Sequence, residues 1–469
     1  MPSILYVTVQ SGLSCHFWSF FLTFFLKVCN IQAVPFLKQF LIKEVFIIKN
    51  IFTVSKNQEQ SAYIWNSASA MLNSFQSVVI LMVISRIDNI IDAGTFVIAY
   101  AISNLLIMVG RYGIRQYQVS DIHEEFIFHE YLVLRIGSTI LMMLSACIYA
   151  GFFYFNGSYD FEKAVIVILV CGIKAVDAFE DVFHGLFQQH KRLDIGGKIL
   201  TFRLFVYIIE YMLVYYFTHN LMTTTVICLL TTIVLSVLLN GSAMKYIPHK
   251  IAHIKAAHLK NLAVDCFPIF ISTFLLAYVA NAPKYSIDIV LSSHDQAQFN
   301  YIFMPVFVIS LLSTFIYQPM INQLAIIWND GKIGRFWRLI LRQTLIIAGL
   351  TGLCMLAGYL LGIPVLSILY GVDLSAYRIE LVILLLGGGL MALINFFTMV
   401  ITVTRYQKHL VWGYLIVSIS FLLQGKKIAA SYGIMGISGF YTLSMTVLAV
   451  IFLVYICIIA RLSKSSKTH

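Results

Sequence analysis

Long apolar stretches recur along the chain from residue 61 onward, and short polar connections separate them. A transmembrane helix needs ~20 predominantly apolar residues, and twelve stretches can supply that length. The pattern therefore predicts an all-α, polytopic membrane protein with about 12 transmembrane helices. We place the spans at residues 61–84, 93–114, 131–155, 161–186, 197–217, 221–243, 264–291, 299–326, 337–361, 377–403, 408–424 and 434–460, of which the eleventh is short.

A faint internal repeat divides these spans into two halves. The sequence DAGTF (Asp92–Phe96) begins the second span, and DQAQF (Asp295–Phe299) begins the eighth. Two six-helix halves in the same orientation would form a parallel repeat about an axis along the membrane normal. We predict an N-terminal six-helix bundle (61–243), a basic cytoplasmic linker (244–263), a C-terminal six-helix bundle (264–460) and a cytoplasmic tail (461–469).

The first 60 residues do not share this regular pattern and are interpreted as an N-terminal extension. An apolar stretch at residues 12–28 precedes residues 36–51, where aromatic residues alternate with lysines. A secretory signal would carry basic residues before its apolar core, and residues 1–14 contain none. Three interpretations stay open: an interfacial basic segment, an additional span, or an upstream extension foreign to the fold.

The composition and charge agree with a membrane protein. Hydrophobic residues make up 60% of the 469 residues and charged residues 11%, whereas soluble domains carry ~25% charged residues. The formal net charge is +11. When both termini are placed inside, the cytoplasmic connections hold seventeen Lys and Arg residues and the outer connections hold five. This positive-inside bias predicts cytoplasmic termini, and no nucleic acid partner is expected.

No motif in the sequence indicates a catalytic, metal or nucleotide centre. Eight cysteines are scattered without a CxxC pair, so neither a disulfide framework nor a zinc site is predicted. His249, His253 and His258 lack acidic or cysteine partners and are not interpreted as a metal site. There is no Walker sequence, and the connections after residue 61 are too short for a soluble catalytic domain. We predict a transporter without a cofactor.

The stretch Cys266–Leu291, within the seventh predicted span, departs most from a purely apolar helix. Asn281, Lys284 and Asp288 follow the spacing i, i+3 and i+7 and therefore share one helical face. Charge at membrane depth is tolerated toward a bundle interior or an aqueous cavity, which makes this face a candidate substrate site. Pro283 lacks a backbone N–H and bends a helix, so we interpret it as a hinge. Mutual neutralisation of Lys284 and Asp288 near the outer surface is the alternative.

The fourth span carries a second group of charges. Five polar residues fall on one arc of about 120°: Lys174, Asp177, Glu180, Asp181 and His184. We interpret Lys174 and Asp177 as candidate residues of a cavity, in which Lys174 would attract an anionic group. Glu180 and Asp181 are interpreted as a self-neutralising cluster of neighbours on one helix, near the cytoplasmic surface.

The fifth span contributes two further cavity candidates, Arg203 and Glu210. Glu210 lies deep in an apolar run, where an isolated carboxylate would be protonated or paired. We predict that Glu210 pairs with Arg203 or Lys174. The alternative is that Glu210 carries a coupling proton.

Three segments resemble the bacterial polysaccharide-biosynthesis exporters: RYGIRQYQVSD after the second span, NAPKYSID in the seventh and YGIMGISGFYTLS before the twelfth. These exporters are the O-antigen, capsule and teichoic-type repeat-unit flippases of the multidrug/oligosaccharidyl-lipid/polysaccharide superfamily. The resemblance covers roughly residues 47–460. NAPKYSID is its most specific part, similar to the family's Asn-x-Pro-Arg-Tyr, and Lys284 stands where Arg is common. The positive charge is kept, but lysine lacks the planar guanidinium group of arginine, which can bind an anion through two parallel hydrogen bonds.

The resemblance implies two six-helix bundles in a V shape in the bacterial inner membrane. It implies export of an undecaprenyl-diphosphate-type lipid-linked oligosaccharide to the outer leaflet by alternating access, as in lipopolysaccharide or capsule assembly. Membrane lipids and other polysaccharide-assembly proteins are the further partners that it implies. Lys174, Arg203 and Lys284 are the cations that the sequence offers to the diphosphate.

Two other functions stay open at this point. An ion-coupled multidrug antiporter of the same superfamily would need a cavity biased toward acids, with Asp177 and Glu210 unpaired. A membrane glycosyltransferase or repeat-unit polymerase would need a substantial extracytoplasmic loop with catalytic residues, and the chain has none.

Overall fold

The computed structural model describes residues 55, 57–87, 90–121, 125–244, 247, 256–317, 320–404, 406 and 409–465. Over these ranges the regular elements are all helices. The residues from Asn57 onward form one compact unit. The predicted extension (1–60) lies almost entirely outside the described residues, as does the central part of the predicted linker (244–263).

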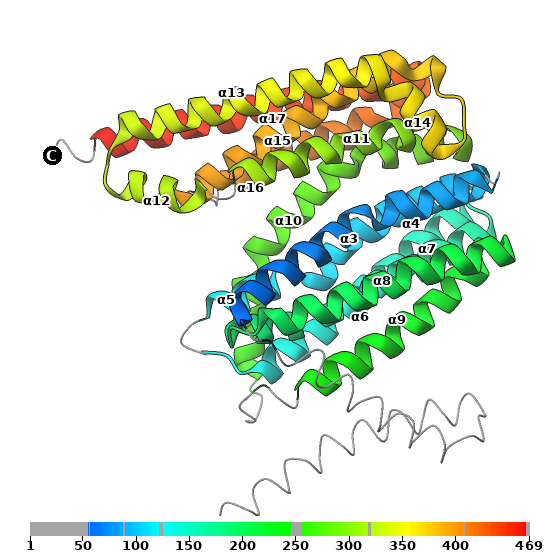
Figure 1. Cartoon of the computed structure of the whole chain (residues 1–469), viewed down its shortest axis with the longest axis horizontal. Helices are drawn as coiled ribbons and strands as arrows, with labels where there is room; N and C mark the ends of the chain where they lie inside the picture. The colour runs from blue at the N-terminus through cyan, green and yellow to red at the C-terminus, as the bar shows by residue number, and fades with distance from the viewer. Residues whose placement is uncertain are drawn as a thin grey trace, which may run out of the picture. The chain divides into compact units, whose positions relative to one another are not determined.

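Seven helices build the N-terminal half (Figure 1). They are α3 (Gln58–Arg86), α4 (Ile90–Arg111), α5 (Ile114–Ser120), α6 (Phe128–Phe155), α7 (Phe161–Gln189), α8 (Leu193–Thr218) and α9 (Leu221–Met244). Asn57 and Asp160 cap α3 and α7, since each side chain accepts a hydrogen bond from a backbone N–H of the first turn. Tyr112 and Gly113 both have positive φ and turn the chain from α4 into the short α5.

The C-terminal half contains longer and interrupted helices. They are α10 (Ala256–Val290), α11 (Ser293–Tyr317), α12 (Ile321–Asn329), α13 (Ile333–Ala357), α14 (Ile363–Tyr370), α15 (Arg378–Val403), α16 (Leu410–Ser420) and α17 (Lys426–Ser465). A π-helical turn, η2 (Gly358–Gly362), joins α13 to α14, and a second one, η5 (Phe421–Gly425), joins α16 to α17. A 3₁₀ turn, η3 (Ser375–Tyr377), precedes α15.

In the described part of the chain, ten helical segments are long and apolar enough to cross a membrane. The highly charged α7 is not among them, and Leu410–Arg461 counts once although Gly433 (φ 57°, ψ −146°) separates two helices within it. With α7 included and that segment divided at Gly433, the described helices correspond to the twelve predicted spans. The predicted eleventh span, 408–424, is too short, because helical backbone continues through η5 to Gly433.

The helices form two bundles arranged as a V (Figure 1). The bundles meet at the end that holds α14 and the start of α4, and they diverge at the end that holds α5 and α12. The helices that begin at the two repeat motifs, α4 and α11, pack against each other. α10 runs from the N-terminal bundle into the C-terminal bundle and contacts helices of both. The predicted all-α, V-shaped fold is therefore confirmed.

The two faces of α6 show how these bundles suit a lipid environment. Arg135 and Ser138 are buried, whereas Ile140, Leu144 and Ile148 are exposed. Part of the buried face of α6 is therefore polar and charged, whereas its exposed face is lined by large apolar residues, opposite to a helix on the surface of a soluble protein.

Candidate functional site

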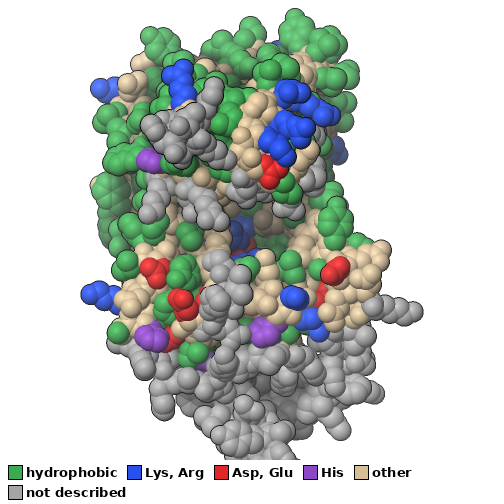
Figure 2. Space-filling model, turned by 90° about the vertical axis from the view of Figure 1, so that its left-hand side faces the viewer, with side chains coloured by type: hydrophobic (Ala, Val, Ile, Leu, Met, Phe, Trp, Pro, Cys, Tyr) green, Lys and Arg blue, Asp and Glu red, His purple; other side chains and the backbone are tan. Residues whose placement is uncertain are grey.

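A hollow separates the two bundles at their diverging end. Figure 2 shows it from that end, with Lys and Arg side chains visible deep inside. The hollow lies between walls contributed by both halves of the chain.

The opposite end of the hollow is closed by contacts between the bundles. The hydroxyl groups of Ser85 (α3) and Tyr301 (α11) are hydrogen-bonded at 2.6 Å. Arg86 donates from Nη2 to the carbonyl oxygen of Ile368 at 2.6 Å and from Nε to that of Leu369 at 3.0 Å. These carbonyls end α14, where the helix dipole favours a cation. The two hydrogen bonds of the Arg86 guanidinium therefore join the end of α3 to the end of α14.

A close backbone approach adds to this closure. A Cβ atom at Gly94 of α4 would overlap the backbone of Ser293, at the start of α11. Only glycine allows the two helices to come this near. Tyr285 of α10 also donates a hydrogen bond to the carbonyl oxygen of Ala101 in α4, at 2.9 Å.

Lys284 lies beside the contact of Tyr285 with α4. The side chain is 5% exposed, and Nζ lies 5.3 Å from the ring centroid of Phe303 and 5.6 Å from that of Phe307, both on α11. No hydrogen bond or ion pair joins Nζ to any residue that the structure describes. Two aromatic faces offset part of the cost of burying the charge, but they supply no counter-ion.

Asp288 does not neutralise Lys284. Its Oδ1 accepts from Nζ of Lys163 at 2.8 Å, and its Oδ2 accepts a short hydrogen bond from the hydroxyl of Tyr159. Lys163 and Tyr159 belong to the N-terminal half, so the carboxylate is another contact between the bundles. The alternative pairing of Lys284 with Asp288 is therefore wrong. Asn281 is buried and bonds to its own helix, from Nδ2 to Ala277 O at 3.2 Å.

The charges of α7 form a buried network inside the N-terminal bundle. Lys174 Nζ donates to Asp177 Oδ2 at 3.0 Å, and Arg203 Nη2 of α8 donates to Asp177 Oδ1 at 2.6 Å. Arg203 Nε donates to Glu180 Oε2 at 2.8 Å, and Asn240 of α9 donates to Glu180 Oε1 at 2.6 Å. Both carboxylates therefore have a partner on each oxygen.

The neighbouring acid of α7, Asp181, is held by two arginines from other helices. Arg115 of α5 and Arg135 of α6 each approach one of its carboxylate oxygens at 3.1 Å. Arg135 also donates to the carbonyl oxygen of Gly110 at 2.7 Å, which ties α6 to α4. The interpretation of Glu180 and Asp181 as a cluster that neutralises itself within one helix is therefore wrong, because their cationic partners come from α5, α6 and α8.

Glu210 also differs from its predicted pairing. Its Oε1 accepts a hydrogen bond from Thr231 of α9 at 2.7 Å, while Arg203 and Lys174 pair with other carboxylates. Its Oε2 is buried without a hydrogen-bond partner. The expected pair of Glu210 with Arg203 or Lys174 is wrong, and Glu210 faces the interface of α8 with α9.

Sequence reasoning missed Arg135 and Asn240. Arg135 is completely buried near the start of the third predicted span, and an intramembrane charge of this kind is itself a signal of an inward-facing residue. Asn240 gives a weaker signal, since one amide near the end of a span is common. The described residues contain no group of three or more His, Cys, Asp or Glu side chains placed to hold a metal ion.

α10 connects the two bundles around Pro283. Toward its inner end, Phe270 stacks at 4.8 Å on Tyr112 in the turn between α4 and α5, and Asp265 accepts a hydrogen bond from Tyr117 of α5 at 3.2 Å. Beyond Pro283, Ser286 packs against Gly425 of η5 in the C-terminal bundle. Tyr285 and Asp288, also beyond Pro283, still contact the N-terminal half, so Pro283 lies in the part of α10 that passes between the two bundles.

Comparisons with known proteins agree with this architecture. No family model matches the chain. The capsular polysaccharide biosynthesis protein CapF of Staphylococcus aureus is 23% identical over 320 residues, which is 68% of this chain and 78% of that protein. The lipid II flippase MurJ, in an inward closed conformation, has a TM-score of 0.65 and 13% identity, over 83% of this chain and 87% of that chain.

A second solved structure has a similar fold. It is an inward-facing multidrug resistance MATE family transporter of the MOP superfamily, with a TM-score of 0.61 and 12% identity over 86% of this chain and 99% of that chain. Taken together, the comparisons confirm the resemblance to polysaccharide flippases that the sequence motifs indicate. The fold of the chain is therefore similar to the fold of these two solved structures.

Proposed function

We propose that this transporter is a flippase that moves a polyprenyl-diphosphate-linked oligosaccharide across the bacterial inner membrane by alternating access. The observation that carries the proposal is Lys284, a buried cation without an anionic partner among the described residues, next to a contact of α10 with the N-terminal bundle. The names of CapF and MurJ agree with this substrate class, because one concerns capsular polysaccharide and the other a lipid-linked cargo.

The diphosphate of the substrate would be the anionic partner that Lys284 lacks among the described residues. A diphosphate that crosses the apolar layer carries negative charge, and an unpaired charge in that layer is very costly. Lys284 would neutralise part of it, and the phosphate oxygens would accept hydrogen bonds from the ammonium group. Lys174 and Arg203 are already paired within the protein, so we assign them to the structure of the N-terminal bundle and keep Lys284 as the principal substrate contact.

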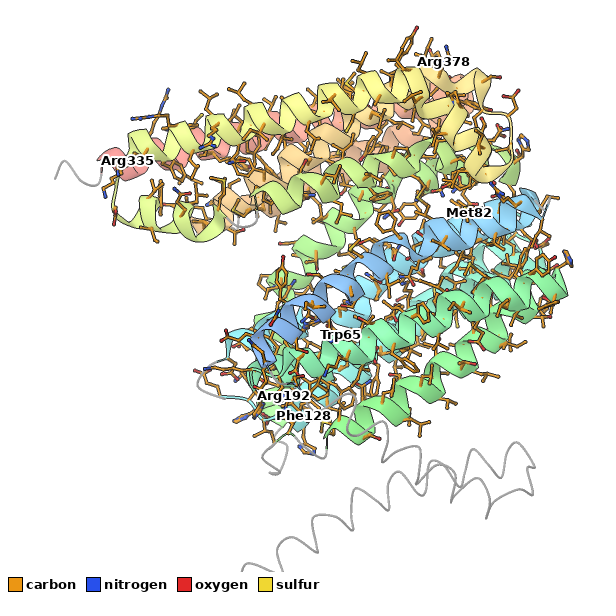
Figure 3. All side chains as sticks on the ribbon, viewed as in Figure 1. Trp65, Met82, Phe128, Arg192, Arg335 and Arg378 are labelled. Carbon is orange, nitrogen blue, oxygen red and sulfur yellow. The ribbon has the colours of Figure 1, made fainter. Side chains whose placement is uncertain are left out.

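The orientation of the hollow fits loading from the cytoplasm. Arg192 and Arg335 lie at the diverging end of the bundles, and Arg378 lies at the closed end (Figure 3). The positive-inside bias supports a cytoplasmic position for the diverging end and for both termini. In this orientation the hollow is open to the inner leaflet, where a lipid-linked oligosaccharide would be received.

The charge network argues against the antiporter alternative. A coupling acid must exchange an ion, but both oxygens of Asp177 are occupied by Lys174 and Arg203. Of the two acids that this alternative requires, only Glu210 lacks a cationic partner among the described residues. Glu210 lies toward α9 and makes no described contact with the C-terminal bundle.

Depletion of the protein tests the proposed function. We expect the lipid-linked oligosaccharide to accumulate on the inner leaflet while its synthesis continues, because the flippase acts after assembly of the sugar chain. The measurement is extraction of the lipid-linked fraction combined with a probe that reaches only the outer leaflet. Normal appearance of the oligosaccharide on the outer leaflet during depletion would refute the assignment.

We also expect α10 to bend at Pro283 during transport. Pro283→Ala restores a backbone donor and removes the ring clash, so α10 should straighten. We expect this variant to remain folded, to bind the lipid-linked substrate and to export slowly. Pro364→Ala is the control for the loss of a helical proline, since Pro364 lies where the helix continues from η2 into α14 and not in α10. Equal glycan export by both variants, at matched expression, would remove the hinge.

A further inference from the structure

The lipid-facing side of α13 carries an unpaired basic stripe, which we define as Arg335, Arg338 and Arg342. The three side chains are exposed and follow the spacing i, i+3 and i+7 along one side of the helix. No ion pair or hydrogen bond joins them to a residue that the structure describes, whereas the adjacent Lys332 pairs with Asp330 at 2.7 Å. α13 runs along the edge of the C-terminal bundle that lies away from the N-terminal bundle (Figure 1).

The stripe begins at the diverging end and runs into the membrane-spanning part of α13. Arg342 follows Ile333 by nine residues, which corresponds to a rise of about 14 Å along the helix. Side chains of a helix point toward its N-terminus, so Arg338 and Arg342 direct their guanidinium groups back toward the membrane surface at this end. Trp337 lies beside the stripe, and tryptophan is enriched at headgroup level.

The stripe borders a shallow groove that is lined partly by charged and partly by apolar side chains. Arg338 and Arg342 contribute its polar part, and Leu341, Leu345 and Ile346 contribute its apolar part. All five side chains are exposed. Two planar guanidinium groups match the oxygens of one phosphate, and a continuous apolar strip beyond them matches an acyl chain. A lipid-exposed arginine at this depth needs an anionic partner, which the described residues do not supply.

We propose that this groove binds an anionic glycerophospholipid, with its phosphate held between Arg338 and Arg342 and an acyl chain along Leu341, Leu345 and Ile346. The bound lipid would fix the start of α13 at the membrane surface while the bundles move against each other. Its assignment to the inner leaflet rests on the proposed orientation, but the site itself does not depend on the substrate of the flippase.

Native mass spectrometry of the purified full-length protein tests the site, with phosphatidylglycerol or phosphatidylcholine added at equal concentration. We expect phosphatidylglycerol to be retained preferentially. The double variant R338Q/R342Q should lower its apparent affinity by about tenfold or more, because two charge contacts are lost. Arg378→Gln, which removes an exposed arginine at the closed end of the molecule, is the matched control and should bind as the wild type does.

Three further outcomes decide between the sources of phosphate. Millimolar inorganic phosphate or pyrophosphate should not displace phosphatidylglycerol, and displacement would overturn the assignment to a lipid. Displacement by an equimolar polyprenyl diphosphate would assign the groove to the transport substrate and also overturn it. Lys284→Ala should retain phosphatidylglycerol as the wild type does, so the lipid site and the proposed transport function can fail separately. Equal binding by the double variant and the Arg378 control would refute the site.

Discussion

Lys284→Ala is expected to abolish glycan export while the amount of protein in the membrane stays normal. The ammonium group has no hydrogen bond or ion pair with a described residue, so its removal leaves no buried anion without a partner. The fold loses the two ring contacts, each worth ~1 kcal/mol or somewhat more when desolvated. The substrate would instead lose the cation that offsets the burial of its diphosphate, which costs several kcal/mol in an apolar medium.

The measurement is surface glycan in cells that carry equal amounts of each variant in the membrane. Lys284→Arg should retain much of the export, because the positive charge is kept at the same place. Lys332→Ala is a control for loss of a lysine, since its pair with Asp330 is exposed and contributes little. Export at the wild-type level by Lys284→Ala would show that the side chain serves packing against Phe303 and Phe307 alone.

The spans could be predicted from the sequence because membrane insertion depends on a local property, the length of an apolar stretch. The errors of span placement have local causes as well. The eleventh span extends beyond its predicted end because Lys426 and Lys427 stop the apolar pattern, although the backbone stays helical as far as Gly433. The sequence predicts α7 as a span in spite of its charges, because the apolar residues on one of its faces recur with the period of an α-helix.

The partners of the charged residues could not be predicted in the same way. Periodicity shows which residues share a face of one helix, but it does not show which helix packs against that face. Asp288 pairs with Lys163, which precedes it by 125 positions, and Asp181 pairs with Arg115, 66 positions away. In both cases the sequence indicates a buried charge, and only the packing of the helices determines its counter-ion.

For Lys284, the partner that the sequence offers is close along the chain but is not used in the structure. The sequence offered a partner four residues away, Asp288, and helical spacing alone permits that pair. In the structure this carboxylate bonds instead to Lys163 and Tyr159 of the N-terminal half, and Lys284 has no ion pair with any residue that the structure describes. The closure of the bundles and the free cation are therefore linked, because the same contact that holds the molecule closed leaves Lys284 available to an anion.

Arg203→Met is expected to destabilise the N-terminal bundle strongly. Arg203 is 1% exposed and is the only described residue that bonds to both Asp177 and Glu180. Its removal leaves two buried carboxylates with too few cationic partners, and breaking a buried pair from one side costs about 3–5 kcal/mol. We expect a lower yield in the membrane and a lower midpoint of thermal unfolding for the detergent-purified protein.

A further variant separates the effect of uncompensated charge on the stability of Arg203→Met from the effect of lost side-chain packing. The triple variant R203M/D177N/E180Q keeps the methionine but removes both negative charges, so it should recover much of the stability if uncompensated charge is the cause. Lys332→Ala, which breaks an exposed pair, should change the free energy of unfolding by no more than about 1 kcal/mol. Equal midpoints for the single and triple variants would show that the network acts through packing. Recovery in the triple variant without recovery of glycan export would place the network in transport as well as in folding.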